Sequence, residues 1–232
     1  MKKRLFLMLG VLAVSVVMQA QPKAGTISVI PRVGINFANL TNNEVVVDLA
    51  NQSKTLKSRI KPGLTIGVDG ELQATDMLSL SIGMHYSMQG SRYPDFERSD
   101  GDFVEGYSDW HTNYDYLNLP LLVGCRIADG FSVKTGVQVG MLVGAKDKLS
   151  VTEIIPMEIG GRQQGNAVGK TENMMDACKK MDISIPVGVS YEFNDVIIDA
   201  RYNFGLTRVY KLEAVKSRNS VIQLSVGYRL HL

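Results

Sequence analysis

The sequence predicts an all-β fold: an eight-stranded antiparallel up-and-down transmembrane β-barrel, preceded by a signal peptide. Three observations support this prediction. From about residue 28 onward, apolar and polar residues alternate with a period of two in eight segments. The links between these segments are alternately long and short, as in barrels with short periplasmic turns and long extracellular loops. No later apolar run approaches the length of a membrane-spanning helix.

The N-terminus has the pattern of a secretory signal peptide. Basic residues 2–4 precede an apolar run over 5–18, and Ala20 is a small residue at a suitable cleavage site. We expect residues 1–20 to be a signal peptide and residues 21–232 to form one outer-membrane β-barrel domain. The net charge of +2 comes from 25 basic and 23 acidic residues. Removing the three bases of the signal leaves 22 − 23 = −1, which does not indicate nucleic-acid binding.

Each segment is long enough for a tilted membrane strand, which needs about 9–11 residues. In order, the predicted strands are 29–37, 63–73, 77–89, 114–126, 131–145, 182–193, 196–206 and 220–232. Apolar residues that keep the period in each, in the same order, are Val33 and Ile35, Leu64 and Ile66, Leu80 and Ile82, Leu119 and Leu121, Val137 and Val139, Ile183 and Ile185, Val196 and Ile198, and Leu224 and Val226.

The links complete the barrel pattern. The short links 74–76, 128–130 and 194–195 are rich in turn-forming residues. The long links are 38–62, 90–113, 146–181 and 207–219, and a compact soluble domain seldom carries four such loops at one end. With eight strands, both chain ends lie on the side of the short turns. Residues 151–155 read as strand, so we expect a strand to extend above the membrane there.

Glycine and charge decide which face points inward. Glycines gather on the polar face, where they suit the narrow interior of an eight-stranded barrel better than a water-facing exterior. The same face carries charges of both signs, which we expect to fill the lumen as ion pairs and leave no pore. The predicted lumenal ionic network is Arg32, Asp69, Glu71, Arg126, Lys134, Glu192, Asp199, Arg201 and Arg229. The alternative is a soluble periplasmic lipocalin-like barrel, which would turn its apolar face inward to bind an apolar ligand.

Several sequence motifs resemble those of the PorT-like outer-membrane β-barrel family, and the resemblance covers about residues 29–232. Residues 31–37 (PRVGINF) are similar to its first strand, 116–122 (YLNLPLL) to its "Y-L-x-I-P-L-L" strand, and 202–206 (YNFGL) and Gly227-Tyr228 to its last two strands. The resemblance implies an eight-stranded barrel in the outer membrane of a Gram-negative cell. It also implies an accessory role in type IX protein secretion and supplies no catalytic residues.

The remaining motifs favour an interaction protein over an enzyme. The acidic link 90–113 does not follow the EF-hand spacing, so we expect no metal, and nothing indicates a cofactor. Only three histidines are present, and none is placed in sequence as the base of a catalytic pair. We therefore predict a structural or interaction protein that contacts outer-membrane lipid through its wall. A protein partner would bind through the outer loops, where Tyr107 and Trp110 are candidate anchors.

Overall fold

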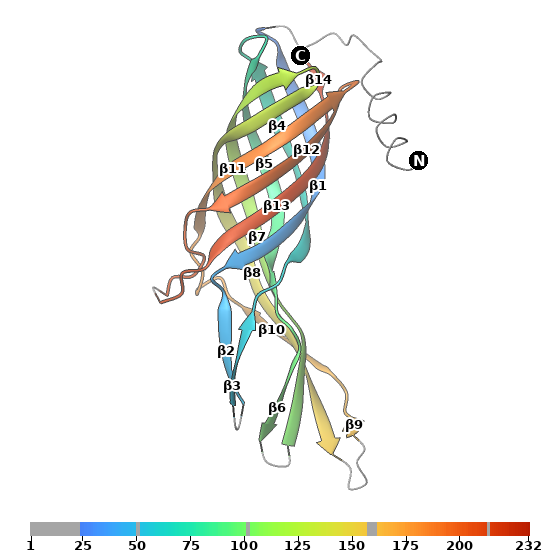
Figure 1. Ribbon diagram of the computed structural model, residues 1–232, viewed down its shortest axis with the longest axis vertical. Helices are drawn as coiled ribbons and strands as arrows, with labels where there is room; N and C mark the ends of the chain where they lie inside the picture. The colour runs from blue at the N-terminus through green and yellow to red at the C-terminus, as the bar shows by residue number, and fades with distance from the viewer. Residues whose placement is uncertain (1–23, 50–51, 101–102, 157–161, 213) are drawn as a thin grey trace, which may run out of the picture.

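Eight antiparallel strands close into a barrel in the computed structural model, which describes residues 24–49, 52–100, 103–156, 162–212 and 214–232 (Figure 1). The signal peptide expected at residues 1–20 lies outside the described residues. The barrel strands are β1 (Ile27–Thr41), β4 (Lys61–Gln73), β5 (Leu78–Arg92), β7 (Phe103–Ala128), β8 (Phe131–Pro156), β11 (Met181–Phe193), β12 (Val196–Gly205) and β13 (Arg218–Tyr228).

Strand pairing confirms the predicted up-and-down topology. Each strand pairs with the next one in this series, and β13 returns to pair with β1. Val33 of β1, for example, lies between Ile66 of β4 and Val226 of β13. The two-residue strand β14 (Leu230–His231) continues along β1. Closure leaves no open edge in the wall, which a membrane requires because every backbone polar group there must be paired.

The short turns and both described chain ends lie at one end of the barrel. Asn194 and Asp195 join β11 to β12 with φ angles of 47° and 64°, the left-handed pair of a type I′ turn. Gly25 N–H donates to Gln73 O over 2.7 Å, and Leu232 N–H donates to Ile27 O over 3.1 Å. Both contacts tie the chain ends to the short-turn end, as predicted.

The apolar face points outward and the polar face inward. Leu64 is 61% exposed and Ile82 is 64% exposed on the outer surface, whereas Asp69 and Arg201 are 2% and 3% exposed. This is the reverse of the pattern that a soluble lipocalin-like barrel requires. Aromatic residues lie near both rims. Tyr191 pairs with Phe131 near the short turns, and Phe37 and Tyr202 flank Ile222 towards the other end.

Two strands are far longer than the predicted ones. β7 and β8 each have 26 residues, or roughly 85 Å at a rise of about 3.3 Å per residue. Residues 103–113 and 146–156, expected to be largely loop, are strand, and the extension expected at 151–155 is confirmed. The shorter strands around them are β2 (Glu44–Leu49), β3 (Gln52–Lys57), β6 (Phe96–Asp100), β9 (Arg162–Gln164) and β10 (Val168–Asn173).

We call these five short strands and the distal halves of β7 and β8 the outer extension. It projects from the barrel end opposite the short turns (Figure 1). Only about 9–11 residues of a tilted strand fit within a bilayer. The outer extension therefore stands in water outside the cell.

Gly83 gives a direct test of how tightly the lumen is packed. A Cβ added there would lie 1.9 Å from Asp69 Oδ1, and the Asp69 carboxylate is held by Arg32 and His85. We expect Gly83→Ala to destabilise the barrel by about 1–3 kcal/mol, the usual range for overpacking. Urea unfolding in lipid measures the change. Gly169→Ala is the matched control, because a Cβ there meets nothing within 4 Å. Equal stability of the two variants would contradict a tightly packed lumen.

Candidate functional site

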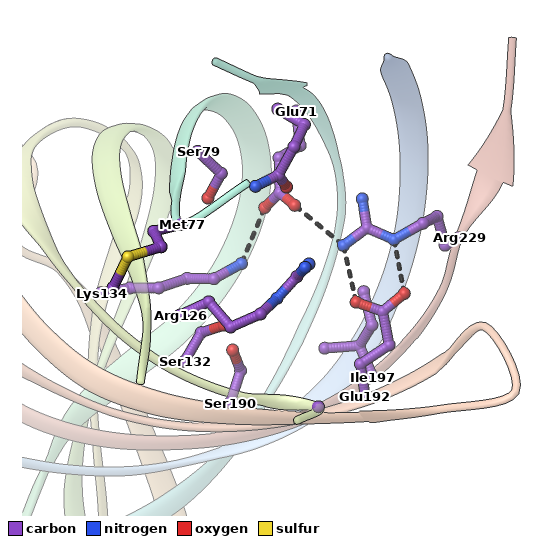
Figure 2. Close-up of a pocket in the computed structure, with 12 residues that line it drawn as sticks. Glu71, Met77, Ser79, Arg126, Ser132, Lys134, Ser190, Glu192, Ile197 and Arg229 are labelled. Carbon is purple, nitrogen blue, oxygen red and sulfur yellow. Dashed lines mark hydrogen bonds and ion pairs between the residues drawn. The ribbon is translucent and has the colours of Figure 1, made fainter. Parts of the chain in front are cut away.

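The largest ionic cluster in the lumen lies near the short turns and joins side chains of β4, β8 and β11 to Arg229, which lies between β13 and β14. Glu71 on β4 accepts hydrogen bonds from Lys134 Nζ of β8 and from Arg229 Nη2, each over 2.8 Å. Arg229 also donates to both carboxylate oxygens of Glu192 on β11, through Nε over 2.6 Å and Nη2 over 2.9 Å. Figure 2 shows Glu71 between the two cations. Because these contacts cross the lumen, the cluster braces opposite walls of the barrel.

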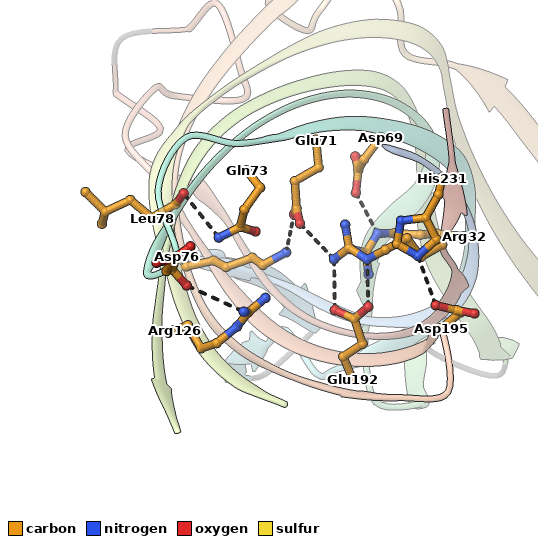
Figure 3. Close-up of polar contacts among 12 residues, drawn as sticks. Arg32, Asp69, Glu71, Gln73, Asp76, Leu78, Arg126, Glu192, Asp195 and His231 are labelled. Atoms are coloured by element: carbon orange, nitrogen blue, oxygen red, sulfur yellow. Dashed lines mark hydrogen bonds and ion pairs between the residues drawn. The ribbon is translucent and has the colours of Figure 1, made fainter. Parts of the chain in front are cut away.

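A second cluster lies next to the first, farther from the short turns. Arg32 Nε of β1 donates to Asp69 Oδ2 over 2.5 Å (Figure 3), and His85 Nε2 of β5 lies 2.7 Å from Asp69 Oδ1. All three side chains are at most 4% exposed. Asp69 and Glu71 are two residues apart on β4, so strand alternation alone places both in the lumen. Strand alternation likewise places His85 on the inner face of β5, but its contact with Asp69 cannot be read from the sequence.

The last buried pair is on β12, where Asp199 and Arg201 are also two residues apart. Arg201 Nη2 lies 3.2 Å from Asp199 Oδ1, and both side chains are 1% exposed. Arg126 differs from the other eight residues of the predicted lumenal ionic network. It is half-buried at the barrel mouth, where Nη1 lies 3.5 Å from the carbonyl oxygen of Asp76 (Figure 3). Eight of the nine residues therefore lie in the three buried clusters.

The opposite end of the lumen is closed by apolar side chains, which we call the outer cap. Tyr114 and Tyr116 of β7 are 0% and 1% exposed, and the Tyr114 hydroxyl lies 2.8 Å from that of Tyr210. The other buried members of the outer cap are Leu40, Leu142, Ala145, Cys178 and Val209. Burial raises the pKa of the Cys178 thiol to about 11, so this free cysteine is a thiol at neutral pH.

Tyr107 and Trp110 lie in the outer extension and belong to one aromatic cluster with Tyr93 and Phe96. The rings of Phe96 and Tyr107 stack with centroids 4.6 Å apart and planes 3° apart, and those of Tyr93 and Trp110 are 4.4 Å apart. Both predicted anchor residues are therefore half-buried against neighbouring rings. Beside the aromatic cluster lies a groove of about 360 Å³. Its lining residues are Val46, Val47, Phe96, Arg98, Tyr107, Trp110 and Leu149.

Asp147 fixes the orientation of the indole of Trp110. Trp110 Nε1 lies 2.9 Å and 3.1 Å from the two carboxylate oxygens of Asp147 on β8. Burial raises the pKa of Asp147, the hydrogen bond from Trp110 and the charge of His111 oppose that increase, and the charge of Glu172 adds to it. The net result is a pKa above the ordinary aspartate value.

This raised pKa predicts that acid stabilises this part of the outer extension through Asp147. The folded state holds the proton more tightly than the unfolded chain does. Asp147 therefore contributes more stability as pH falls through the raised pKa, and its contribution is complete below about 3.9, the ordinary aspartate pKa. Trp110 is the only tryptophan in the chain, so its fluorescence should titrate with a midpoint above that value. Asp147→Asn should remove this transition, and an unchanged titration in the variant would contradict the assignment.

Among the described residues, no group of three or more His, Cys, Asp or Glu side chains is placed to hold a metal ion. No helix in the described ranges is long and apolar enough to cross a membrane.

One comparison with known protein families agrees with the architecture. A family model described as "Outer membrane protein beta-barrel domain" matches residues 19–211. No curated protein sequence matches the chain. Among solved structures, Ail, the attachment invasion locus protein of Yersinia pestis, is 14% identical, with 89% of this chain and 99% of that chain covered and a TM-score of 0.41.

Two further solved structures resemble the chain at similar levels. Neisserial surface protein A is 11% identical, with 88% of this chain and 97% of that chain covered and a TM-score of 0.43. The outer membrane protein OprG from Pseudomonas aeruginosa is 8% identical, with 92% and 100% covered and a TM-score of 0.40. Identities this low carry no inference about a shared activity.

Proposed function

Because the chain belongs to the outer membrane protein beta-barrel domain family and resides in the cell outer membrane, we propose that it is a non-enzymatic interaction protein whose outer extension binds a partner at the cell surface. One observation carries the proposal: two 26-residue strands continue from the barrel wall into the medium and carry an aromatic cluster beside an apolar groove. Structure that extends so far beyond the bilayer is not needed to hold the barrel in the membrane.

The construction of the outer extension supports recognition. Its base is continuous with the barrel wall through β7 and β8, so the groove is held by paired strands. Val46 is 61% exposed at the groove, close to the half-buried Tyr107 and Trp110. Aromatic side chains with an exposed apolar rim are typical of protein-binding surfaces. The lumen, by contrast, is crossed by ion pairs and closed by the outer cap, which supports a bracing role there.

A trimmed variant separates membrane anchoring from binding. Tyr93 N–H donates to Trp110 O, and Lys148 pairs with Thr171, so the chain runs close to itself at both points. The segment between Tyr93 and Trp110 and the segment between Lys148 and Thr171 can therefore each be replaced with an Asn-Gly turn. We expect the trimmed protein to remain in the outer membrane after an alkaline wash and to keep its heat-dependent gel mobility. Loss of membrane insertion in the trimmed protein would show that the outer extension serves folding.

Photo-crosslinking in intact cells tests the binding itself. A photoreactive residue at Val46 should give a discrete protein adduct that disappears with Phe96→Ala, because Phe96 supports the groove. Ile82, equally exposed but on the barrel wall, is the matched control and should crosslink to lipid. If Val46 gives no specific protein adduct, or one that survives Phe96→Ala, recognition through the groove is wrong.

The accessory role in type IX secretion remains a narrower proposal, which depends only on the PorT-like resemblance of the sequence. The matching family model describes the barrel domain and does not specify that subfamily. Deleting the gene and measuring secretion of type IX substrates tests the proposal. Unchanged secretion would rule the role out without affecting the proposed binding by the outer extension.

A further inference from the structure

The middle of the lumen contains charged and polar groups whose hydrogen-bonding capacity is not used within the protein. Arg201 is 3% exposed, yet its Nε, Nη1 and Nη2 have no hydrogen-bond partner among the described residues. Both carboxylate oxygens of Asp199, which is 1% exposed, likewise have no hydrogen-bond partner among the described residues. Their 3.2 Å contact brings the opposite charges together without hydrogen-bond geometry.

The neighbouring side chains share this property and lie on adjacent strands. Ser225 of β13 is the register partner of Asp199, and Gln223 is that of Arg201. Asn36 of β1 lies beside Gln223 in turn. Within the described part of the chain, Ser225 Oγ, Gln223 Nε2 and Asn36 Oδ1 likewise have no partner. The unused donors and acceptors therefore form one continuous patch on the inner faces of β12, β13 and β1.

Elementary energetics requires partners for these atoms. Buried polar groups are almost always hydrogen-bonded, and an unpaired buried charge costs much more than an unpaired neutral group. The patch mixes donors from Arg201 and Gln223 with acceptors from Asp199 and Asn36, and water is both donor and acceptor. Gly34 lies opposite Ser225 and Gly188 opposite Arg201, and a Cβ at either glycine would meet the backbone of the facing strand, so these strands pack closely beside the patch.

We propose that this patch is an internal water site: ordered water molecules bridge Asp199, Arg201, Gln223, Ser225 and Asn36 in the middle of the barrel. A buried water typically makes two to four hydrogen bonds, and the patch offers enough groups for several such molecules. A bound chloride is the weaker alternative, because the Asp199 carboxylate lies 3.2 Å from the guanidinium that would hold the anion. The lumen is thus wet at this level and directly ion-paired nearer the short turns.

Proton exchange at arginine Nε tests the water site in the unmodified protein. We would measure exchange with water for the barrel in lipid nanodiscs with ¹⁵N-labelled arginine, and assign Arg201 through its neighbours Ala200 and Tyr202. Arg229 is the internal control, since its Nε donates to Glu192 and lies near the mouth of the barrel. We expect Arg201 Nε–H to exchange roughly tenfold or more faster than Arg229 Nε–H. Arg201 should also show a direct cross-peak to water.

Two results would overturn the water site. Exchange at Arg201 as slow as at Arg229, with no water cross-peak, would mean that Arg201 and Asp199 rearrange into a dry hydrogen-bonded pair. A shift of the Arg201 resonance when chloride is replaced by sulfate would mean that an anion is bound instead. Since the measurement needs no substitution, a failure to fold cannot obscure either outcome.

Discussion

Glu71→Gln should destabilise the barrel by about 3–5 kcal/mol, the cost of removing one partner from a buried ion pair. Glu71 is 4% exposed and accepts hydrogen bonds from Lys134 and Arg229. Arg229 keeps Glu192 as a partner, whereas Glu71 is the only carboxylate bonded to Lys134 among the described residues. The substitution conserves size, so the loss reports charge. Urea unfolding in lipid vesicles measures the free energy of unfolding.

Two further variants identify the cause of this loss. Glu153→Gln removes an exposed carboxylate of the outer extension and should change stability by less than about 0.5 kcal/mol. The double variant Glu71→Gln/Lys134→Gln should be less destabilised than the sum of its single changes, because it leaves no stranded ammonium group. A Glu71→Gln effect no larger than that of Glu153→Gln would show that the cluster does not brace the barrel.

Ile82→Arg should have the second large effect, about 2–4 kcal/mol, the cost of an arginine on the lipid face near the bilayer midplane. Ile82 is 64% exposed on the outer face of β5, and its register partners Gly70 and Leu121 lie well inside their own strands. Val46→Arg is a stringent control, because Val46 is 61% exposed in the outer extension. There we expect a change within about 0.5 kcal/mol, since arginine is fully hydrated in water.

The contrast between these two substitutions depends on the surrounding solvent alone. Both replace an exposed β-branched side chain on a strand with arginine. Equal effects at Ile82 and Val46, measured by folding into vesicles at increasing urea, would mean that both sites face the same medium. The membrane assignment of the barrel wall would then fail.

The barrel itself could be predicted because a membrane imposes a strict pattern. Lipid outside and a narrow lumen inside force apolar and polar or small residues to alternate, so each of the eight wall strands is readable from the sequence. The glycines on the polar face also predicted correctly that this face points into the lumen. Gly83, where a Cβ would meet the Asp69 carboxylate, shows why small residues are required there.

The outer half of β7 could not be predicted, because it lies outside the membrane that imposes this alternation. Residues 103–113 stand in water, where both faces of a strand tolerate polar side chains, so the alternation fades. Val151 to Ile155 remained readable because three of those five residues are β-branched apolar residues. Within the lumen, alternation indicates which charges point inward but not which ones meet. Glu71 contacts Lys134 and Arg229, which are 63 and 158 positions away, and only the stagger of the closed barrel brings them together.

Spin-label accessibility at Ile82 tests most directly the claim that the apolar face contacts lipid. With Cys125 and Cys178 replaced by alanine, a nitroxide at Ile82→Cys should collide readily with oxygen and be shielded from a water-soluble nickel chelate. The same label at Val46→Cys should show the opposite preference. A label at Ile82 that is open to the nickel chelate and shielded from oxygen would contradict the account, because the apolar wall would then face water.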